Sequence, residues 1–318
     1  MFLEKAFTYQ NHFLKYIVGT LIVVIASTIG QVPLFVAVML ELNNQGKNIS
    51  QLDESTLMTV LEQNMTLFLM LLSFAVALIG LILVLRLFHK QRLKDITTAR
   101  PKIDFGRIAF AFGIWAIFQI IVTAINYYVS PEDFVWNFKL EPFLILLAVG
   151  TIMIPIQTST EEYFFRGYLM QGFGLMAKNK WLPLIMTSVI FGGLHYFNPE
   201  VVKMGPIIMI YYIGTGLFLG IITLMDDGLE LALGFHAANN LITALLVTSE
   251  WTAFQTHSVL KDISEPSAGY EVITPVLVIF PILIFIFAKK YGWNNWKEKL
   301  TGVISEPNSE SIEFIQND

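Results

Sequence analysis

The sequence predicts an all-α membrane protein of about eight transmembrane helices. Of its 318 residues, 55% are hydrophobic and only 14% are charged, whereas a soluble globular domain carries about 25% charged residues. The mean hydropathy is +0.62, and several apolar runs reach the roughly 18 residues that a membrane-spanning helix needs. These observations exclude a chain that is surrounded by water on all sides.

Eight apolar segments are expected to cross the membrane. The first follows two lysines, but its apolar run is longer than the roughly 7–15 residues of a signal-peptide core, so we interpret it as a helix. The segments are residues 13–40, 57–88, 108–129, 140–160, 182–196, 206–225, 229–247 and 272–288.

Lysine and arginine collect on one side of the predicted membrane, which is typical of cytoplasmic segments. With the N-terminus inside, 15 of the 20 Lys and Arg residues fall in inner segments and 4 in outer loops, and Arg166 is left within a span. This asymmetry predicts an even number of spans with both termini cytoplasmic, and we expect a bacterial plasma membrane. The Asp226–Asp227–Gly228 turn would also be inside. The basic loop of residues 89–107, which includes His89, is expected at the lipid headgroups.

Residues 1–300 are expected to form one polytopic membrane domain, and residues 301–318 a polar, disordered cytoplasmic tail. The outer loop of residues 249–271 is polar and acidic, so it is either a lid or a plain connector. The absence of cysteine excludes disulfides, thiolate ligands and thiol nucleophiles. Membrane lipid is an expected partner. Nucleic acid is not, because the sequence has no nucleic-acid-binding patch.

Ionisable residues cluster where the fourth apolar segment ends, at Glu161, Glu162 and Arg166. Insertion of each such residue into a membrane helix costs about 3 kcal/mol, so a cluster of them indicates a functional or structural role. Glu162 and Arg166 are four residues apart and can pair on one helix face. Glu161 is turned about 100° away and stays unpaired, so it is the better general base. The alternative is a helix end whose three side chains extend to water.

Two further polar groups lie in apolar segments. His195 ends the fifth segment after the Gly192–Gly193 pair, and such small residues let a neighbouring backbone or a substrate approach closely. His236 and Asn240 are four residues apart in the seventh segment and share a face. For Asn239, which points elsewhere, we expect an interhelical hydrogen bond.

These residues form three motifs, in order, on three helices, and they resemble those of the CAAX protease and bacteriocin-processing (CPBP, or Abi) family. That family includes the Ras-converting endopeptidases that trim prenylated proteins. The resemblance covers a core of about residues 140–247. The motifs are Glu161-Glu162-x-x-x-Arg166, Phe191-x-x-x-His195 and His236-x-x-x-Asn240.

The resemblance implies an eight-helix bundle with an intramembrane catalytic cavity that hydrolyses peptide bonds of a membrane-associated or C-terminally presented substrate. Glu161 would be the base that activates water, and His195 would help to hold that water. His236 and Asn240 would stabilise the tetrahedral oxyanion. Glu162 and Arg166 match the remainder of the first motif as a supporting ion pair.

Several alternatives stay open. Glu161, His195 and His236 could bind zinc with an open fourth position, although we favour hydrolysis without a metal or other cofactor. A transporter or a non-cleaving scaffold would also place polar groups in membrane helices. The predicted boundaries put Glu161 and His195 about 20 Å apart along the helix axes, so a shared site requires a tilted fifth helix or different boundaries.

Overall fold

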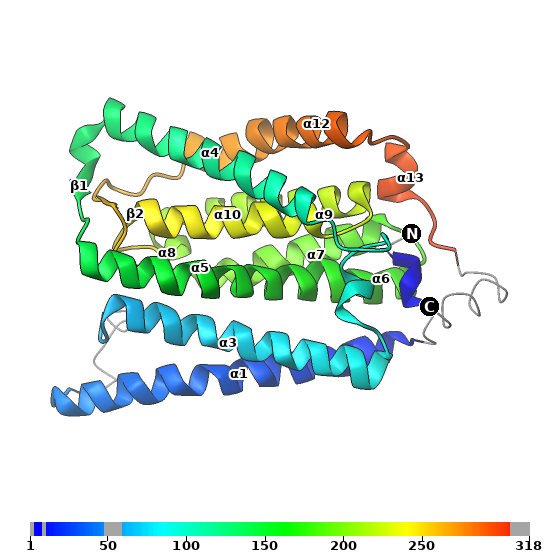
Figure 1. The fold of residues 1–318 in the computed structure, drawn as a ribbon, viewed down its shortest axis with the longest axis horizontal. Helices are drawn as coiled ribbons and strands as arrows, with labels where there is room; N and C mark the ends of the chain where they lie inside the picture. Colours follow the sequence, from blue (N-terminus) through cyan, green and yellow to red (C-terminus); the bar gives the residue numbers. More distant parts are fainter. Residues whose placement is uncertain (1–2, 8–10, 48–58, 306–318) are drawn as a thin grey trace.

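The computed structural model describes residues 3–7, 11–47 and 59–305, and nearly all regular structure in them is helical (Figure 1). The prediction of an all-α polytopic membrane protein is confirmed, because the described residues contain six helical segments that are long and apolar enough to cross a membrane. These segments are Phe13–Asn44, Gln63–His89, Phe105–Val129, Leu140–Ala177, Pro206–Asp226 and Tyr270–Tyr291.

The other two predicted spans are helices of a different kind. The fifth forms α7 (Trp181–Leu194) and the 3-10 turn η7 (His195–Phe197), which are apolar but short. The seventh forms α10 (Glu230–Leu246), in which every residue from Glu230 to Ala238 is buried. Figure 1 shows α10 in the middle of the bundle. Because protein surrounds α10, it does not need the long apolar surface of a lipid-facing helix.

The bundle is built by pairs of neighbouring helices. α1 (Phe13–Asn44) packs on α3 (Gln63–Val84), and α3 packs on α5 (Leu140–Glu162). α10 packs between α5 and α4 (Phe105–Val129), while α7 pairs with α9 (Met209–Asp226). The remaining elements are η1 (Leu3–Ala6), η3 (Leu85–His89), η4 (Leu93–Ile96), η5 (Pro131–Asp133), η6 (Tyr163–Leu169), α6 (Met170–Ala177), α8 (Pro199–Met204), η8 (Pro206–Ile208), α11 (Tyr270–Thr274), η9 (Pro275–Ile279), α12 (Phe280–Tyr291) and α13 (Trp296–Thr301).

A small sheet lies at the end of the bundle opposite α13 (Figure 1). Its order is β1 (Phe134–Trp136), β3 (Leu260–Asp262) and β2 (Val247–Thr248), with β1 antiparallel and β2 parallel to β3. β3 belongs to the outer loop that the sequence leaves as a lid or a connector. The strands tie this loop to the start of α5 and the end of α10.

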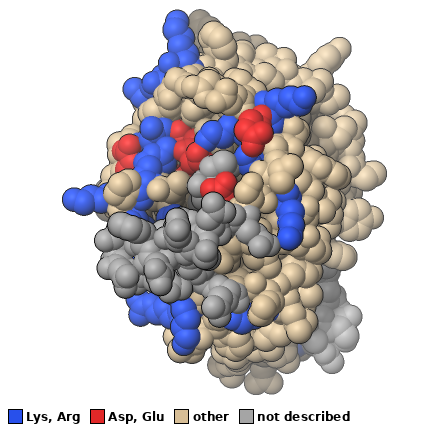
Figure 2. Space-filling view, turned by 90° about the vertical axis from the view of Figure 1, so that its right-hand side faces the viewer, with Lys and Arg blue, Asp and Glu red and all other residues tan. Residues whose placement is uncertain are grey.

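The elements η1 and α13 lie at the same end of the bundle, which agrees with an even number of crossings (Figure 1). Figure 2 shows Lys and Arg side chains gathered with Asp and Glu on this face. The loop of residues 89–107 differs from the prediction, because part of it packs on the protein. Arg100 and Arg107 form ion pairs with Asp226 at 2.8 and 2.5 Å, and Arg100 also pairs with Glu230. These contacts hold the acidic α9–α10 turn at a basic end.

Two local predictions at this end are wrong. His89 ends a helix rather than lying in a loop, and its buried ring binds Asn11 Oδ1 at 2.8 Å and the Tyr168 hydroxyl at 3.0 Å. The polar tail does not begin at residue 301, because Ile304 is buried and its N–H donates to the carbonyl of Lys178. Residues 306–318 of the predicted tail lie outside the described residues.

The contact between α10 and α4 depends on Gly234, because a Cβ at this position would collide with the carbonyl oxygen of Ile108. We expect Gly234→Ala to lower the free energy of unfolding by about 1–3 kcal/mol, as overpacked cores do. Gly113→Ala on α4 is the matched control, because a Cβ there meets no atom within 4 Å. Thermal unfolding in detergent measures both, and equal stability of the two variants would contradict this packing.

Candidate functional site

Glu162 and Arg166 form an ion pair whose side chains are both fully buried. Arg166 Nη1 donates to Glu162 Oε1 at 2.9 Å, as the four-residue spacing predicts. Arg166 Nη2 donates to the carbonyl of Gly216 on α9 at 3.2 Å. The guanidinium also lies 4.2 Å from the ring centre of Phe191 on α7. The pair therefore connects the helix that carries Glu162 and Arg166 to α9 and to α7.

The helix that carries the two glutamates does not end there, which corrects the sequence-based position of the site. α5 continues through the π-helical turn η6 into α6, so one apolar helix runs from Leu140 to Ala177. At 1.5 Å per residue, Glu161 lies about 24 Å along it from Ala177, and His195 lies about 21 Å along α7 from Trp181. The two residues are thus at similar heights, and the expected 20 Å separation along the axes is wrong.

His236 on α10 faces both glutamates. Its Nδ1 donates to Glu162 Oε1 at 2.7 Å, and its Nε2 lies 3.5 Å from Glu161 Oε2. The side chains of His236 and Glu161 are 7% and 14% exposed, and Glu161 Oε2 has no hydrogen-bond partner among the described residues. Glu162 therefore orients the imidazole, while the longer 3.5 Å contact joins the imidazole to Glu161. The spacing within one helix predicts the contact of Glu162 with Arg166 but not the contacts with His236.

One turn away, Asn240 Nδ2 donates to Oε1 of Gln157 at 3.0 Å. Gln157 is buried and precedes Glu161 by four residues, so both lie on the face of α5 that meets α10. The pairs Glu161–His236 and Gln157–Asn240 are thus successive contacts of one helix pair. Sequence reasoning missed Gln157, although its spacing to Glu161 is a signal that could have found it.

His195 lies at the end of α7 and joins the site only through neighbours. Its Nδ1 donates to the carbonyl of Phe191 at 2.8 Å, and its ring stacks on Tyr212 with centroids 4.5 Å apart. The Phe191 ring lies 4.8 Å from the His195 ring and 6.0 Å from the His236 ring. In the described part of the chain, His195 makes no direct hydrogen bond to Glu161, His236 or Asn240.

Glu200 on α8 is a second residue that the sequence analysis missed. Its Oε1 accepts a hydrogen bond from the N–H of Ala253 at 2.9 Å, which ties the outer loop to α8. Burial raises the pKa of this carboxyl, while the nearby His195 lowers it. No periodic pattern marks Glu200, because it lies in a helix of only six residues.

The two glycines before His195 differ in their surroundings. A Cβ at Gly192 would meet the backbone of Ile213 on α9, so this position allows α7 and α9 to approach closely, whereas Gly193 has open space around its Cα. The expected close approach of a neighbouring backbone is present at Gly192.

The three candidate zinc ligands are not gathered. Nowhere in residues 3–7, 11–47 and 59–305 do three or more His, Asp or Glu side chains form a group that could hold a metal ion. The Nδ1 atoms of His236 and His195 donate to Glu162 and to the carbonyl of Phe191, which leaves Nε2 of each ring free. The three residues do not come together as a zinc site in the described part of the chain.

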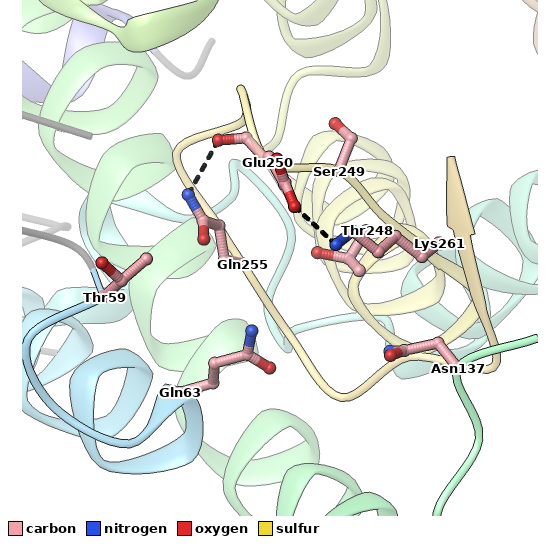
Figure 3. Close-up of a pocket in the computed structure, with 8 residues that line it drawn as sticks. All are labelled: Thr59, Gln63, Asn137, Thr248, Ser249, Glu250, Gln255 and Lys261. Atoms are coloured by element: carbon pink, nitrogen blue, oxygen red, sulfur yellow. Dashed lines mark hydrogen bonds and ion pairs between the residues drawn. The ribbon is translucent and has the colours of Figure 1, made fainter. Parts of the chain in front are cut away.

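A cavity of about 410 Å³ lies at the outer end, beside β2 and β3 (Figure 3). The two charged residues that line it, Lys261 and Glu250, pair with each other, and Gln255 donates to the carbonyl of Glu250. None of the predicted site residues lines this cavity. Its lining residues are Thr59, Gln63, Asn137, Thr248, Ser249, Glu250, Gln255 and Lys261.

Comparison with known proteins places this geometry in a family. Residues 139–242 match the family described as type II CAAX prenyl endopeptidase Rce1-like. Over 242 residues the chain is 30% identical to the uncharacterized protein YyaK of Bacillus subtilis. The matched region covers 76% of this chain and 80% of YyaK. The chain belongs to the Rce1-like family. No solved structure matches it.

The Rce1-like segment begins at the start of α5 and ends within α10, so it contains all six predicted site residues and Gln157. Membership supports a CAAX-type intramembrane endopeptidase, and a protease implies a peptide or protein substrate. The helices α1, α3, α4 and α12 lie outside the segment.

The buried ion pair yields a stability prediction. Arg166→Met leaves Glu162 without its guanidinium, and removal of one partner from a buried pair costs about 3–5 kcal/mol. Lys261→Met is the control, because its partner Glu250 is 79% exposed and surface pairs contribute about 1 kcal/mol or less. Denaturant unfolding in detergent measures both variants, and similar losses would show that the Arg166 pair has no special role.

Proposed function

We propose that the chain is an intramembrane endopeptidase in which Glu161 activates water without a metal. The observation that carries the proposal is the buried Glu161 Oε2, which has no hydrogen-bond partner among the described residues and faces His236 Nε2 at 3.5 Å. A carboxylate oxygen that the protein leaves unsatisfied, close to an imidazole, is suited to take a proton from water. Glu162 Oε2 also lacks a hydrogen-bond partner among the described residues, but Arg166 and His236 both donate to Glu162 Oε1 and make this carboxylate the weaker base.

The proton positions around His236 support this assignment. Because Nδ1 donates to Glu162 Oε1, a neutral His236 has a lone pair on Nε2. Two acceptors would then face each other across 3.5 Å, which is unfavourable unless a proton lies on one of them or on a molecule between them. A hydrolytic water, or a proton shared by His236 and Glu161, satisfies both atoms.

The reaction uses these groups in order. A water molecule bonds to the carbonyl carbon of the substrate and loses a proton to Glu161. Before this step the proton shared by His236 and Glu161 lies on His236 Nε2, so that Glu161 is a carboxylate and His236 an imidazolium. The carbonyl oxygen becomes an oxyanion, which accepts hydrogen bonds from His236 Nε2 and from Asn240 Nδ2. The C–N bond then breaks as Glu161 returns the proton to the leaving amine. One oxyanion donor is worth about 100- to 1000-fold in kcat.

The proposed substrate is a membrane-associated or C-terminally presented peptide or protein. His195 has its Nδ1 proton on the Phe191 carbonyl, so a neutral His195 offers Nε2 as an acceptor that helps to hold the water. The end of the bundle where Lys and Arg side chains gather (Figure 2), and where Arg100 and Arg107 pair with Asp226, is the proposed cytoplasmic side. A lipid-anchored substrate would approach the site from the membrane that surrounds the helices.

Substitution of the two neighbouring glutamates separates their roles. In purified full-length protein, we expect Glu161→Gln to lower cleavage of a peptide library by at least about 100-fold while thermal stability is retained. Glu162→Gln should mainly lower the unfolding temperature, because it weakens a buried ion pair. Glu141→Gln, on the exposed first turn of α5, is the matched control. The library contains S-prenylated CAAX peptides and unmodified peptides, and mass spectrometry reads the products.

Retention of wild-type cleavage by Glu161→Gln would refute the assignment of the base. Absence of cleavage of every library peptide by the wild-type protein would favour a non-cleaving scaffold or a transporter.

The metal-free mechanism has its own test. We expect purified, active protein to contain much less than one equivalent of zinc, and cleavage to persist after incubation with a chelator. Elemental analysis and the cleavage assay are made on the same sample. One tightly bound equivalent, with activity lost on chelation and restored by zinc, would overturn the proposal.

A further inference from the structure

Four side chains from three helices form a continuous chain of hydrogen bonds that ends at the site. Trp115 Nε1 on α4 donates to Asn239 Oδ1 at 3.0 Å. Asn239 Nδ2 donates to Asn240 Oδ1 at 3.0 Å, and Asn240 Nδ2 donates to Gln157 Oε1 at 3.0 Å. We name these four residues the amide relay.

The direction of the amide relay is determined by Trp115. An indole N–H can only donate, so the Asn239 atom that faces it must be the oxygen. This orientation leaves Asn239 Nδ2 to donate toward Asn240, and Asn240 must in turn present its oxygen to Asn239 and its amide nitrogen to Gln157. If Asn240 were turned over, two NH₂ groups would face each other at one side and two oxygens at the other.

Trp115 is held firmly enough to serve as this reference. It is 5% exposed, and its ring packs against Phe118 and Phe235 with centroids 4.9 and 4.5 Å away. A second contact supports the same helix pair, because Gln119 Nε2 on α4 donates to the carbonyl of Asn239 at 3.3 Å. The close packing of α4 on Gly234 therefore places an oriented donor beside the site.

We propose that Trp115 is a positioning residue, which acts through Asn239 to keep the NH₂ group of Asn240 turned toward α5 and the reacting carbonyl oxygen. The inference rests on the proposed function, in which Asn240 donates to the oxyanion. One hydrogen of Asn240 Nδ2 is used on Gln157, and the second is then available to the substrate. Trp115 lies outside the Rce1-like segment of residues 139–242, so this role is carried by a part of the chain that the motifs do not cover.

The first test is Trp115→Phe, assayed with S-prenylated CAAX peptides that the wild-type protein cleaves. Loss of the donor lets Asn240 populate both orientations, and we expect kcat to fall about tenfold with KM unchanged, which corresponds to the loss of about one hydrogen bond. Trp293→Phe is the matched control, because its Nε1 donates to Asp226 Oδ1 at 3.0 Å, away from the relay. That variant should lose stability and keep its kcat.

A second variant separates polarity from ring packing. Asn239→Asp keeps an acceptor for Trp115 but has no NH₂ group for Asn240, so kcat should fall as in Trp115→Phe while the ring cluster stays intact. Full activity of a folded Asn239→Asp variant would overturn the relay.

A double-mutant cycle with Asn240→Ala decides whether Trp115 acts through Asn240. The relay requires that Trp115→Phe has no further effect on kcat in the Asn240→Ala background. Independent effects that multiply would show that Trp115 acts on the fold alone, and they would overturn the relay while the proposed function stands. If Asn240→Ala itself keeps wild-type kcat, the oxyanion role of Asn240 fails, and the relay fails with it.

Discussion

The buried ion pair between Glu162 and Arg166 is the interaction on which the arrangement of the site depends. Neither side chain is exposed to solvent, and further contacts offset part of the cost of burying a charge pair. Three helices supply such contacts, through His236 on α10, the carbonyl of Gly216 on α9 and the ring of Phe191 on α7. Arg166 Nε and Glu162 Oε2 have no hydrogen-bond partner among the described residues. The contacts to one buried guanidinium and one buried carboxylate thus fix three helices relative to α5. Glu161, the preceding residue, takes none of these contacts and faces His236 Nε2 at 3.5 Å.

Close packing of helix backbones brings these partners within reach. A Cβ at Gly192 would meet Ile213, one at Gly216 would meet Ser188, and one at Gly234 would meet Ile108. Where lipid rather than water surrounds the helices, small residues at the contacts determine how near two helices can come. The α7–α9 contact therefore positions Phe191 and the Gly216 carbonyl around Arg166, and the α4–α10 contact positions Trp115 beside Asn239. The geometry of the polar site therefore depends on the close helix contacts at these glycines.

The features that the sequence predicts are those that depend on one helix at a time. The membrane segments follow from apolar length, and the Glu162–Arg166 pair follows from a four-residue spacing within one helix. The end of α5 could not be predicted, because residues 163–177 are as compatible with a continued helix as with a loop. Contacts between helices, such as Gln157 with Asn240, depend on the register of two helices, which no single-helix pattern contains. The strand at Leu260–Asp262 was missed for a similar reason, because it is defined by partners at Phe134–Trp136 and Val247–Thr248. The catalytic roles stay predictions, since geometry alone does not test them.

A carboxamide is nearly symmetric in shape, so the presence of Asn240 on the correct helix face does not determine whether it offers a donor or an acceptor. In water either orientation finds partners, but in a buried site the wrong one leaves unpaired groups at about 1–3 kcal/mol each. The orientation must therefore be determined by a group that can only donate or only accept a hydrogen bond, and the indole N–H of Trp115 can only donate. In the proposed mechanism the motif residues supply the chemistry, while a helix outside the Rce1-like segment determines which atom of Asn240 faces the substrate.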